Sequence, residues 1–139
     1  MTSHIRALIV DDAEYTRTMT ISMLHSINVH DIVEADCATA ALDILRGRDI
    51  DIVLLDVVMP GMTGLEMLKE LRADPTISMK KVILVTAAAD AKTILLARAH
   101  STRADAIIVK PFSVLTLKEK IAHVMKGSEA VKEKLVITK

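Results

Sequence analysis

The sequence predicts an α/β domain in which five βα units form a doubly wound, five-stranded parallel sheet. Five short apolar runs without polar alternation are spread along the chain, and such runs are typical of parallel strands covered on both faces. Segments with helical spacing of their apolar residues follow the runs, which is the alternation that builds a parallel sheet. Because a closed barrel needs about eight strands, five strands predict an open sheet with helices on both faces.

The five expected strands are apolar runs that end at polar or turn-forming residues. They are Ile5–Val10, Ile32–Ala35, Ile52–Leu55, Val82–Val85 and Ala106–Val109. The third run is followed at once by Asp56 and then by the segment 60–64, whose proline and two glycines predict a loop. The third run is therefore expected to be a strand of the sheet interior, with a carboxylate at its carboxyl end.

Five further segments have the residue spacing of helices. With their marker residues, they are Ala13 to about Ser26 (Tyr15, Met19, Met23, Leu24, Ile27), Thr39–Arg46 (Ala41, Leu42, Leu45), a segment with Leu65, Leu68 and Leu71, about Ala91 to His100 (Ile94, Leu95, Arg98), and a last helix (Leu117, Ile121, Met125). Gly47 and Pro75 stand where the second and third helices should end, and Ser113 can cap the last one.

Length and composition exclude several classes of protein. The length of 139 residues favours one domain, over 1–126, with a short charged tail over 127–139. The net charge of zero argues against binding to nucleic acids or to membranes. The only aromatic residues are Tyr15 and Phe112, so base-stacking surfaces are not expected. Cys37 is alone, and no segment resembles a signal peptide or a membrane span, so we expect a cytoplasmic protein.

Polar residues stand at the carboxyl ends of four of the expected strands. They are Asp11 and Asp12 after the first strand, Asp56 after the third, Thr86 after the fourth and Lys110 after the fifth. Parallel strands bring these positions to one edge of the sheet. Carboxylates without Cys or His favour a hard ion such as Mg²⁺, and hydroxyl and ammonium groups are donors for phosphoryl oxygens. An Asp carboxylate can itself be the nucleophile that takes a phosphoryl group.

Each of these residues also has a structural interpretation when it is taken alone. The Asp11-Asp12 pair could cap the first helix, Thr86 could be a turn residue, and Lys110 could be a solvated surface charge. The convergence of all of them on one edge favours a Mg²⁺-assisted phosphoacceptor site.

Other function classes lack residues that they need. A phosphatase with an Asp nucleophile would place a general acid two residues after Asp56, where this chain has Val58. A nucleotide or flavin site would need a glycine-rich loop after the first strand, but no glycine precedes Gly47. A zinc site is disfavoured because the five histidines show no i,i+4 pairing and Cys37 has no mate.

One set of motifs matches a known family. The motifs are Asp11-Asp12, Asp56 with Met59-Pro60 and Gly64, Thr86-Ala87, and Lys110-Pro111-Phe112. With them the chain resembles, from about Ile5 to Met125, the receiver domain of two-component response regulators in its single-domain, CheY-like form. The resemblance implies the flavodoxin-like strand order 2-1-3-4-5. It also implies a signalling protein and not an enzyme, apart from its own phosphorylation and at most slow dephosphorylation.

The resemblance assigns roles to the acidic residues. Asp56 would accept a phosphoryl group from a sensor histidine kinase or a histidine phosphotransfer protein. Asp12, Asp56 and the backbone carbonyl of Val58 would bind Mg²⁺, or Mn²⁺ in its place, and Asp11 would act through water.

Further roles follow for the remaining positions. Lys110 would pair with the phosphoryl oxygens, Thr86 would swing in to bond one of them, and the Lys110–Pro111 peptide would be cis. The phosphodonor would dock near Ala13–Thr16. In the family's usual switch an aromatic residue stands where this chain has Ile107, so that form of readout is not expected here.

The chain departs from the family pattern at other positions too. Arg103-Ala104 stand where a glycine often precedes the fifth strand. Val58 and Ala88 occupy positions that tune dephosphorylation, and neither side chain can orient a water, so fast assisted hydrolysis is not expected. A pseudo-receiver that only binds partners, a phosphorelay shuttle and a phosphate sink remain alternatives.

The expected output is contact with a downstream protein, through the fourth helix, fifth strand and fifth helix. The candidate residues of that face are Lys92, Ile94, Arg98, Ile107 and Lys118. A monomer or a weak homodimer is expected.

Overall fold

The computed structural model describes residues 4–87 and 103–126, which form a five-stranded parallel sheet in the order β2-β1-β3-β4-β5. The strands are β1 (Arg6–Val10), β2 (Asp31–Ala35), β3 (Ile52–Asp56), β4 (Lys81–Ala87) and β5 (Ala106–Lys110). The helices are α1 (Glu14–Ser26), α2 (Ala38–Gly47), α3 (Gly64–Ala73) and α5 (Val114–Val124). The doubly wound fold and its strand order are confirmed.

The predicted elements within these residues are all present, with ends shifted by one or two residues. Asp56 and Lys110, expected just after their strands, are the last residues of β3 and β5. The helix expected over Ala91–His100 and the tail 127–139 lie outside the described residues. None of the described helices is long and apolar enough to cross a bilayer.

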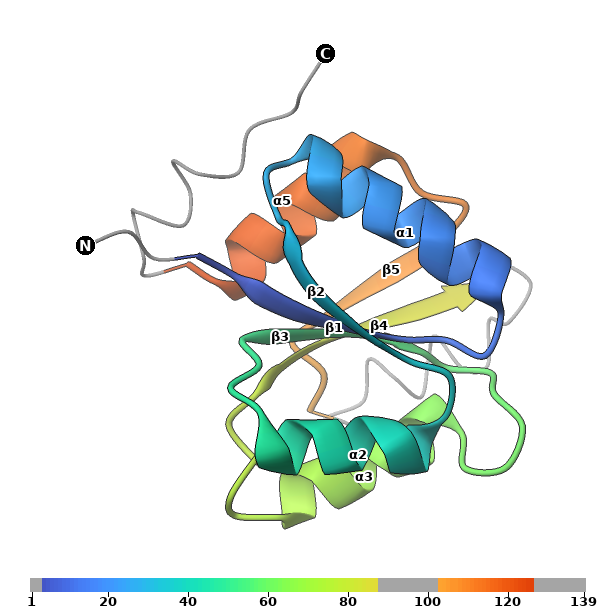
Figure 1. Ribbon diagram of the computed structural model, residues 1–139, viewed down its shortest axis with the longest axis vertical. Coiled ribbons are helices and arrows are strands. Elements are labelled where there is room, and N and C mark those ends of the chain that lie inside the picture. The colour runs from blue at the N-terminus through green and yellow to red at the C-terminus, as the bar shows by residue number, and fades with distance from the viewer. Residues whose placement is uncertain (1–3, 88–102, 127–139) are drawn as a thin grey trace.

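Helices cover both faces of the sheet, with α1 and α5 on one face and α2 and α3 on the other (Figure 1). Successive residues of a strand point to opposite faces, so the central strands divide their side chains between two cores. Leu8, Val10, Val53, Leu55, Val82 and Leu84 pack with α2 and α3, whereas Ala7, Ile9, Ile52, Leu54, Ile83 and Val85 pack with α1 and α5. This double burial explains why the strands are apolar without alternation.

The predicted stripe of α1 is confirmed at Leu24 and Ile27, which are buried, and is wrong at Tyr15 and Met19. Tyr15 is 74% exposed and Met19 44% exposed, whereas Thr20 and Leu24 are the buried residues of the helix. Thr20 can be buried because its hydroxyl donates to the carbonyl of Thr16 at 3.0 Å. The prediction was wrong at these positions because it chose buried residues by hydrophobicity, whereas a threonine whose hydroxyl is hydrogen-bonded can also be buried.

The amino-terminal end of α3 is defined by local contacts. Thr63 Oγ1 accepts from the Glu66 N–H at 3.2 Å, and Glu66 Oε1 accepts from the Thr63 N–H at 2.9 Å, which is a capping box. The next residue, Gly64, lies against the end of β3, where an added Cβ would clash with the Asp56 carbonyl oxygen. Ser113 caps α5 as predicted, accepting from the Thr116 N–H at 3.1 Å.

An arginine network holds the amino-terminal edge of β4 and β5. The Arg72 guanidinium of α3 donates to the carbonyl oxygens of Ser78 (2.9 Å), Lys80 (2.6 Å) and Arg103 (2.9 Å), and to Asp105 Oδ2 (3.0 Å). Asp105 Oδ2 also accepts from the backbone N–H of Val82, the second residue of β4, at 2.7 Å. Arg103 takes the left-handed conformation (φ 52°) in the region where the family often has glycine. Its carbonyl is held there by Arg72.

Candidate functional site

Four charged side chains meet at the carboxyl-terminal edge of the sheet. Asp56 ends β3 and Lys110 ends β5, while Asp11 and Asp12 directly follow β1. Lys110 Nζ lies 3.2 Å from Asp56 Oδ1 and 3.5 Å from Asp11 Oδ2. These residues are far apart in sequence, and they meet because parallel strands all end on the same edge.

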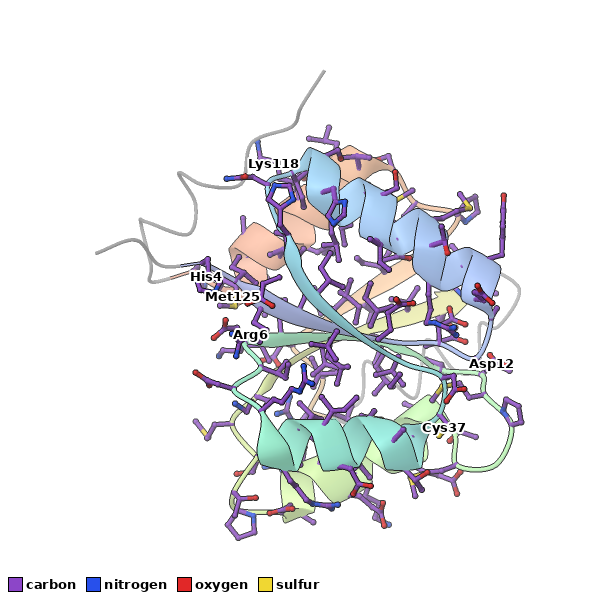
Figure 2. The ribbon with its side chains drawn as sticks, in the orientation of Figure 1. His4, Arg6, Asp12, Cys37, Lys118 and Met125 are labelled. Atoms are coloured by element: carbon purple, nitrogen blue, oxygen red, sulfur yellow. The ribbon has the colours of Figure 1, made fainter. Side chains whose placement is uncertain are left out.

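The three carboxylates form a compact acidic cluster. Ligand oxygens of Asp11, Asp12 and Asp56 all lie within 4.8 Å of one another. Asp11 and Asp56 are buried, whereas Asp12, which is labelled in Figure 2, is exposed. Burial raises the pKa of Asp56, and the negative charges of Asp11 and Asp12 raise it further, while the Lys110 ammonium acts in the opposite direction. The cluster therefore carries more negative charge than its one lysine balances.

Asp11 is held in place by its neighbours and does not cap α1. The N-cap of α1 is Ala13, which makes no side-chain capping bond. Asp11 Oδ1 accepts from the Ala13 N–H at 2.9 Å, and the Asp11 N–H donates to the carbonyl of Ala35, the last residue of β2, at 3.1 Å. The carboxylate of Asp11 is thus fixed beside Asp56, with Oδ2 directed at Lys110.

Thr86 lies inside β4, because the strand runs to Ala87, two residues past its predicted end. Its side chain is 1% exposed, and within the described part of the chain Oγ1 has no hydrogen-bond partner. A buried hydroxyl without a partner costs free energy, so it needs an explanation. A site that receives a further oxygen atom would provide the partner.

The residues of this edge fit a divalent cation and a phosphoryl group. Three carboxylates without nitrogen or sulfur ligands suit a hard ion such as Mg²⁺. The Lys110 ammonium and the unpartnered Thr86 hydroxyl are hydrogen-bond donors suited to phosphoryl oxygens.

Comparison with known proteins establishes the family to which the chain belongs. A family model described as the response regulator receiver domain matches residues 7–122. The chain belongs to this family. It is similar to chemotaxis protein CheY-3 of Vibrio cholerae serotype O1 (36% identical over 121 residues, 87% of this chain and 92% of the relative). It is also similar to chemotaxis protein CheY of Pseudomonas aeruginosa (35% over 120 residues, 86% and 95%).

Solved structures agree with this receiver fold. The chemotaxis response regulator CheY4 of Vibrio cholerae superposes with a TM-score of 0.78 at 24% identity, over 88% of this chain and 100% of that chain. A putative response regulator from Chloroflexus aurantiacus gives a TM-score of 0.81 at 22% identity, over 88% and 98%. The chain is thus a receiver domain of the CheY type, a class of signalling proteins and not of classical enzymes.

The other predicted site positions of this receiver lie near the cluster or on β5. Val58 is in the loop after β3, with its side chain 62% exposed. The Lys110–Pro111 peptide bond is cis. Ile107 is half-buried on β5 and packs against the core that α2 and α3 share with the sheet. This receiver therefore has an aliphatic core residue, Ile107, at the position where the family's usual switch has an aromatic residue.

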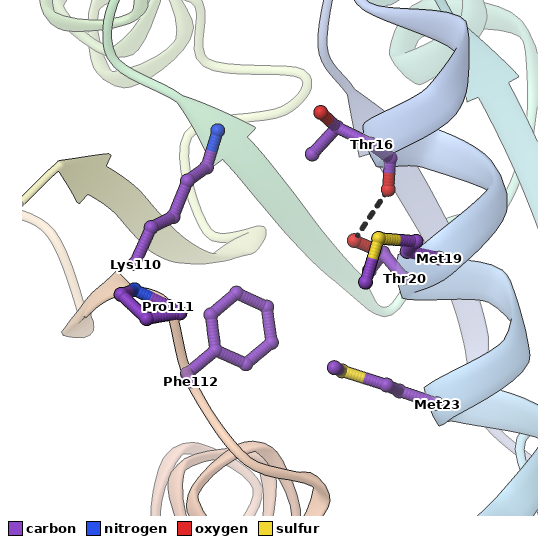
Figure 3. Close-up of a pocket in the computed structure, with 7 residues that line it drawn as sticks. All are labelled: Thr16, Met19, Thr20, Met23, Lys110, Pro111 and Phe112. Carbon is purple, nitrogen blue, oxygen red and sulfur yellow. Dashed lines mark hydrogen bonds between the residues drawn. The ribbon is translucent and has the colours of Figure 1, made fainter.

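An apolar groove lies beside the acidic site and was not predicted from the sequence. It has a volume of about 350 Å³ and runs between α1 and the segment that follows β5 (Figure 3). Its lining residues are Thr16, Met19, Thr20, Met23, Lys110, Pro111 and Phe112. The sequence signal for this groove is the pair Met19 and Met23 on α1, although their spacing predicts a buried stripe. Met19 is 44% exposed and Met23 is half-buried, and both side chains line the groove.

Proposed function

We propose that the chain is a stand-alone response regulator that accepts a phosphoryl group on Asp56. One observation carries the proposal: the buried Asp56 carboxylate lies 3.2 Å from Lys110, in an acidic cluster whose oxygens are within 4.8 Å of one another. The donor would be a phosphohistidine of a histidine kinase or a phosphotransfer protein. The receiver family and the all-oxygen chemistry of the site support this proposal.

In this mechanism, the acidic residues have two tasks. Asp12, Asp56 and the Val58 carbonyl would hold Mg²⁺ directly, and Asp11 would hold it through water. The ion, when bound, neutralises the acidic cluster and the phosphoryl oxygens. An Asp56 oxygen forms the new P–O bond while the P–N bond of the phosphohistidine breaks, and the leaving imidazole keeps the electron pair and takes up a proton.

Lys110 and Thr86 would bind the phosphoryl group after transfer. Lys110 Nζ already lies beside Asp56, so it can follow the charge from the carboxylate to the phosphoryl oxygens. The buried Thr86 hydroxyl, which lacks a partner within the described residues, would donate to one of those oxygens. Satisfying that hydroxyl favours the phosphorylated arrangement of the loops and is the local event that the output would follow.

The output would be a phosphorylation-dependent contact with another protein. The candidate face contains β5 and α5, including Ile107 and Lys118, together with residues 91–100 of the sequence. Two relatives named as chemotaxis proteins favour an output in that kind of pathway. We further propose a cytoplasmic location, a receiver domain over residues 1–126 with a tail over 127–139, and a monomer or weak homodimer.

The phosphoryl group is expected to persist for longer than seconds. Val58 and Ala88 cannot orient an attacking water by hydrogen bonding, so assisted hydrolysis should be slow. Decay within seconds, followed by intact-mass measurement after removal of the donor, would contradict this expectation.

Intact-mass measurement with acetyl phosphate and Mg²⁺ tests the proposal. The unmodified chain should gain one phosphoryl group, and the gain should disappear with EDTA and in the Asp56→Asn variant. Asp51→Asn is a matched control, because Asp51 is a carboxylate at the opposite edge of the sheet, where it accepts from the Arg6 N–H at 2.8 Å. It should be phosphorylated like the unmodified chain. If the folded chain gains no phosphoryl group from acetyl phosphate or from a phosphorylated kinase, the proposal fails and the receiver acts by binding alone.

A further inference from the structure

Arg17 of α1 reaches back to the loop that carries the acidic pair. Its Nη1 donates to the backbone carbonyl of Asp11 at 2.7 Å, and its Nε donates to Glu34 Oε1 at 3.0 Å. The Arg17 side chain is only 14% exposed. One guanidinium therefore joins the end of β1, the first turns of α1 and the end of β2.

This contact adds a tertiary hydrogen bond to the start of α1, where the N-cap residue Ala13 makes no side-chain capping bond. The local contact of this loop is the Asp11 carboxylate, which accepts from the Ala13 N–H at 2.9 Å. Arg17 holds the loop from further along the helix, and its own N–H donates to the Ala13 carbonyl at 3.1 Å. The position of Asp12, which follows Asp11 and is itself exposed, then depends on how firmly the Asp11 backbone is held.

The charge of Arg17 is balanced locally. A cation behind the acidic cluster would by itself repel a second cation. The Glu34 carboxylate, at 3.0 Å, neutralises the guanidinium and leaves a pair without net charge. Arg17 can thus hold the loop through its directed N–H groups without opposing a divalent ion at the cluster.

We propose that Arg17 is a positioning residue for the divalent-cation site, and that Glu34 is its neutralising partner. Arg17 touches neither the cation nor the phosphoryl group. It acts through the Asp11 carbonyl, by holding the Asp11-Asp12 loop in the conformation that places both carboxylates beside Asp56. This inference rests on the proposed function, because it assigns a role toward the same cation.

The test is the affinity of the full chain for Mn²⁺, measured from the EPR signal of free Mn²⁺ at constant pH and ionic strength. Arg17→Met should weaken binding about tenfold, the scale found when a partner that orients metal ligands is removed. Arg17→Lys should fall between Arg17→Met and the unmodified chain, because a single ammonium cannot bond both oxygens with the guanidinium's geometry. Glu34→Gln should weaken binding about two- to threefold at low salt and less at high salt, because it leaves the arginine charge unbalanced.

Arg46→Met is the matched control. Arg46 also pairs with a carboxylate, Asp74, at 2.9 Å, but it lies on α2 near the opposite edge of the sheet. It should leave the Mn²⁺ affinity unchanged. Thermal unfolding without metal should show that every variant is folded, and Glu34→Gln should keep the fold because the Glu34 side chain is 46% exposed.

The possible outcomes separate this inference from the proposed function. If Arg17→Met and Glu34→Gln bind Mn²⁺ like the unmodified chain, even with a lowered melting temperature, Arg17 is only a structural brace and the inference is wrong. If the unmodified chain binds Mn²⁺ no better than its Asp12→Asn variant, the cation site itself fails, and both proposals fall. Weaker binding in Arg17→Met, with phosphorylation of Asp56 retained at high Mg²⁺, supports the inference.

Discussion

The two edges of the sheet shift the pKa values of their carboxyl groups in opposite directions. At the amino-terminal edge, Asp31 accepts from Arg6 at 2.9 Å and Asp74 from Arg46 at 2.9 Å (Arg6 is labelled in Figure 2). Hydrogen bonds from Arg6 lower the pKa of Asp31, and bonds from Thr76 and Arg46 lower the pKa of Asp74 to about 2. At the carboxyl-terminal edge, burial and like charges raise the pKa of Asp56.

The difference separates residues that stabilise the fold from residues that serve the site. The acids of the amino-terminal edge have cationic partners in the folded chain, so folding favours their charged form. At the other edge three carboxylates share one lysine, and the raised pKa of Asp56 means that the charged form of Asp56 opposes folding until a cation or another donor arrives. A receiver can hold such a cluster because contacts elsewhere, such as the Arg72 network, stabilise the sheet.

The largest effect is expected at the amino-terminal edge, from Arg72→Met. The change removes the donors for three backbone carbonyls and for Asp105, in a side chain that is 9% exposed. Loss of such a partly buried network should lower the free energy of unfolding by about 3 kcal/mol. Urea unfolding measures the loss, with the more exposed Arg46→Met as control. A loss below about 1 kcal/mol would mean that the hydrogen bonds of Arg72 in the folded chain are scarcely stronger than its hydrogen bonds to water in the unfolded chain.

The second effect belongs to the carboxyl-terminal edge alone. Mg²⁺ at about 100 times its dissociation constant should add about 2.7 kcal/mol to the free energy of unfolding, because it binds only the folded chain. EDTA should remove the gain, and Asp12→Asn should abolish most of it. Equal stabilisation of Asp12→Asn and the unmodified chain in thermal melts would place the ion elsewhere.

A smaller effect with an unusual sign is expected from Asp56→Asn without metal. Removing one buried charge from the acidic cluster should raise the free energy of unfolding at pH 7, on the order of 1 kcal/mol. The pKa of Asp56 is higher in the folded chain than in the unfolded chain, so protonation favours folding and the advantage of the variant should shrink as the pH falls through that raised value. Urea unfolding at pH 7 and pH 4 tests this. If the variant is less stable than the unmodified chain at pH 7, the charge of Asp56 does not destabilise the folded chain, and the prediction is wrong.

The smallest effect is expected from Asp74→Asn, with the opposite dependence on pH. Because the pKa of Asp74 is lowered from its ordinary 3.8 to about 2, its stabilising contribution is present above about pH 4 and is lost as the pH falls toward 2. The variant should melt slightly lower than the unmodified chain at pH 6, and the difference should vanish near pH 2. A difference that grows on acidification would contradict the contrast between the two edges.

The parallel sheet and the residues that gather at one edge of it can be predicted from the amino-acid sequence. The strands are buried on both faces, so their side chains are apolar without alternation, and Asp11, Asp56, Thr86 and Lys110 mark their carboxyl ends. The cap at Ser113 was equally predictable, because a capping residue acts on the N–H groups of its own helix. These features depend on neighbours in the chain or on the direction of parallel strands.

The exposure of Tyr15 and Met19, the burial of Thr20 and the groove beside the site depend on how α1 docks on the sheet. The partners of Arg17 and Arg72, and the left-handed backbone of Arg103, also depend on tertiary contacts. The physical reason is that a long side chain finds its acceptors among backbone carbonyls from other elements, and carbonyls are the same in every residue. Periodicity and motif spacing carry no information about such contacts until the helices are docked on the sheet.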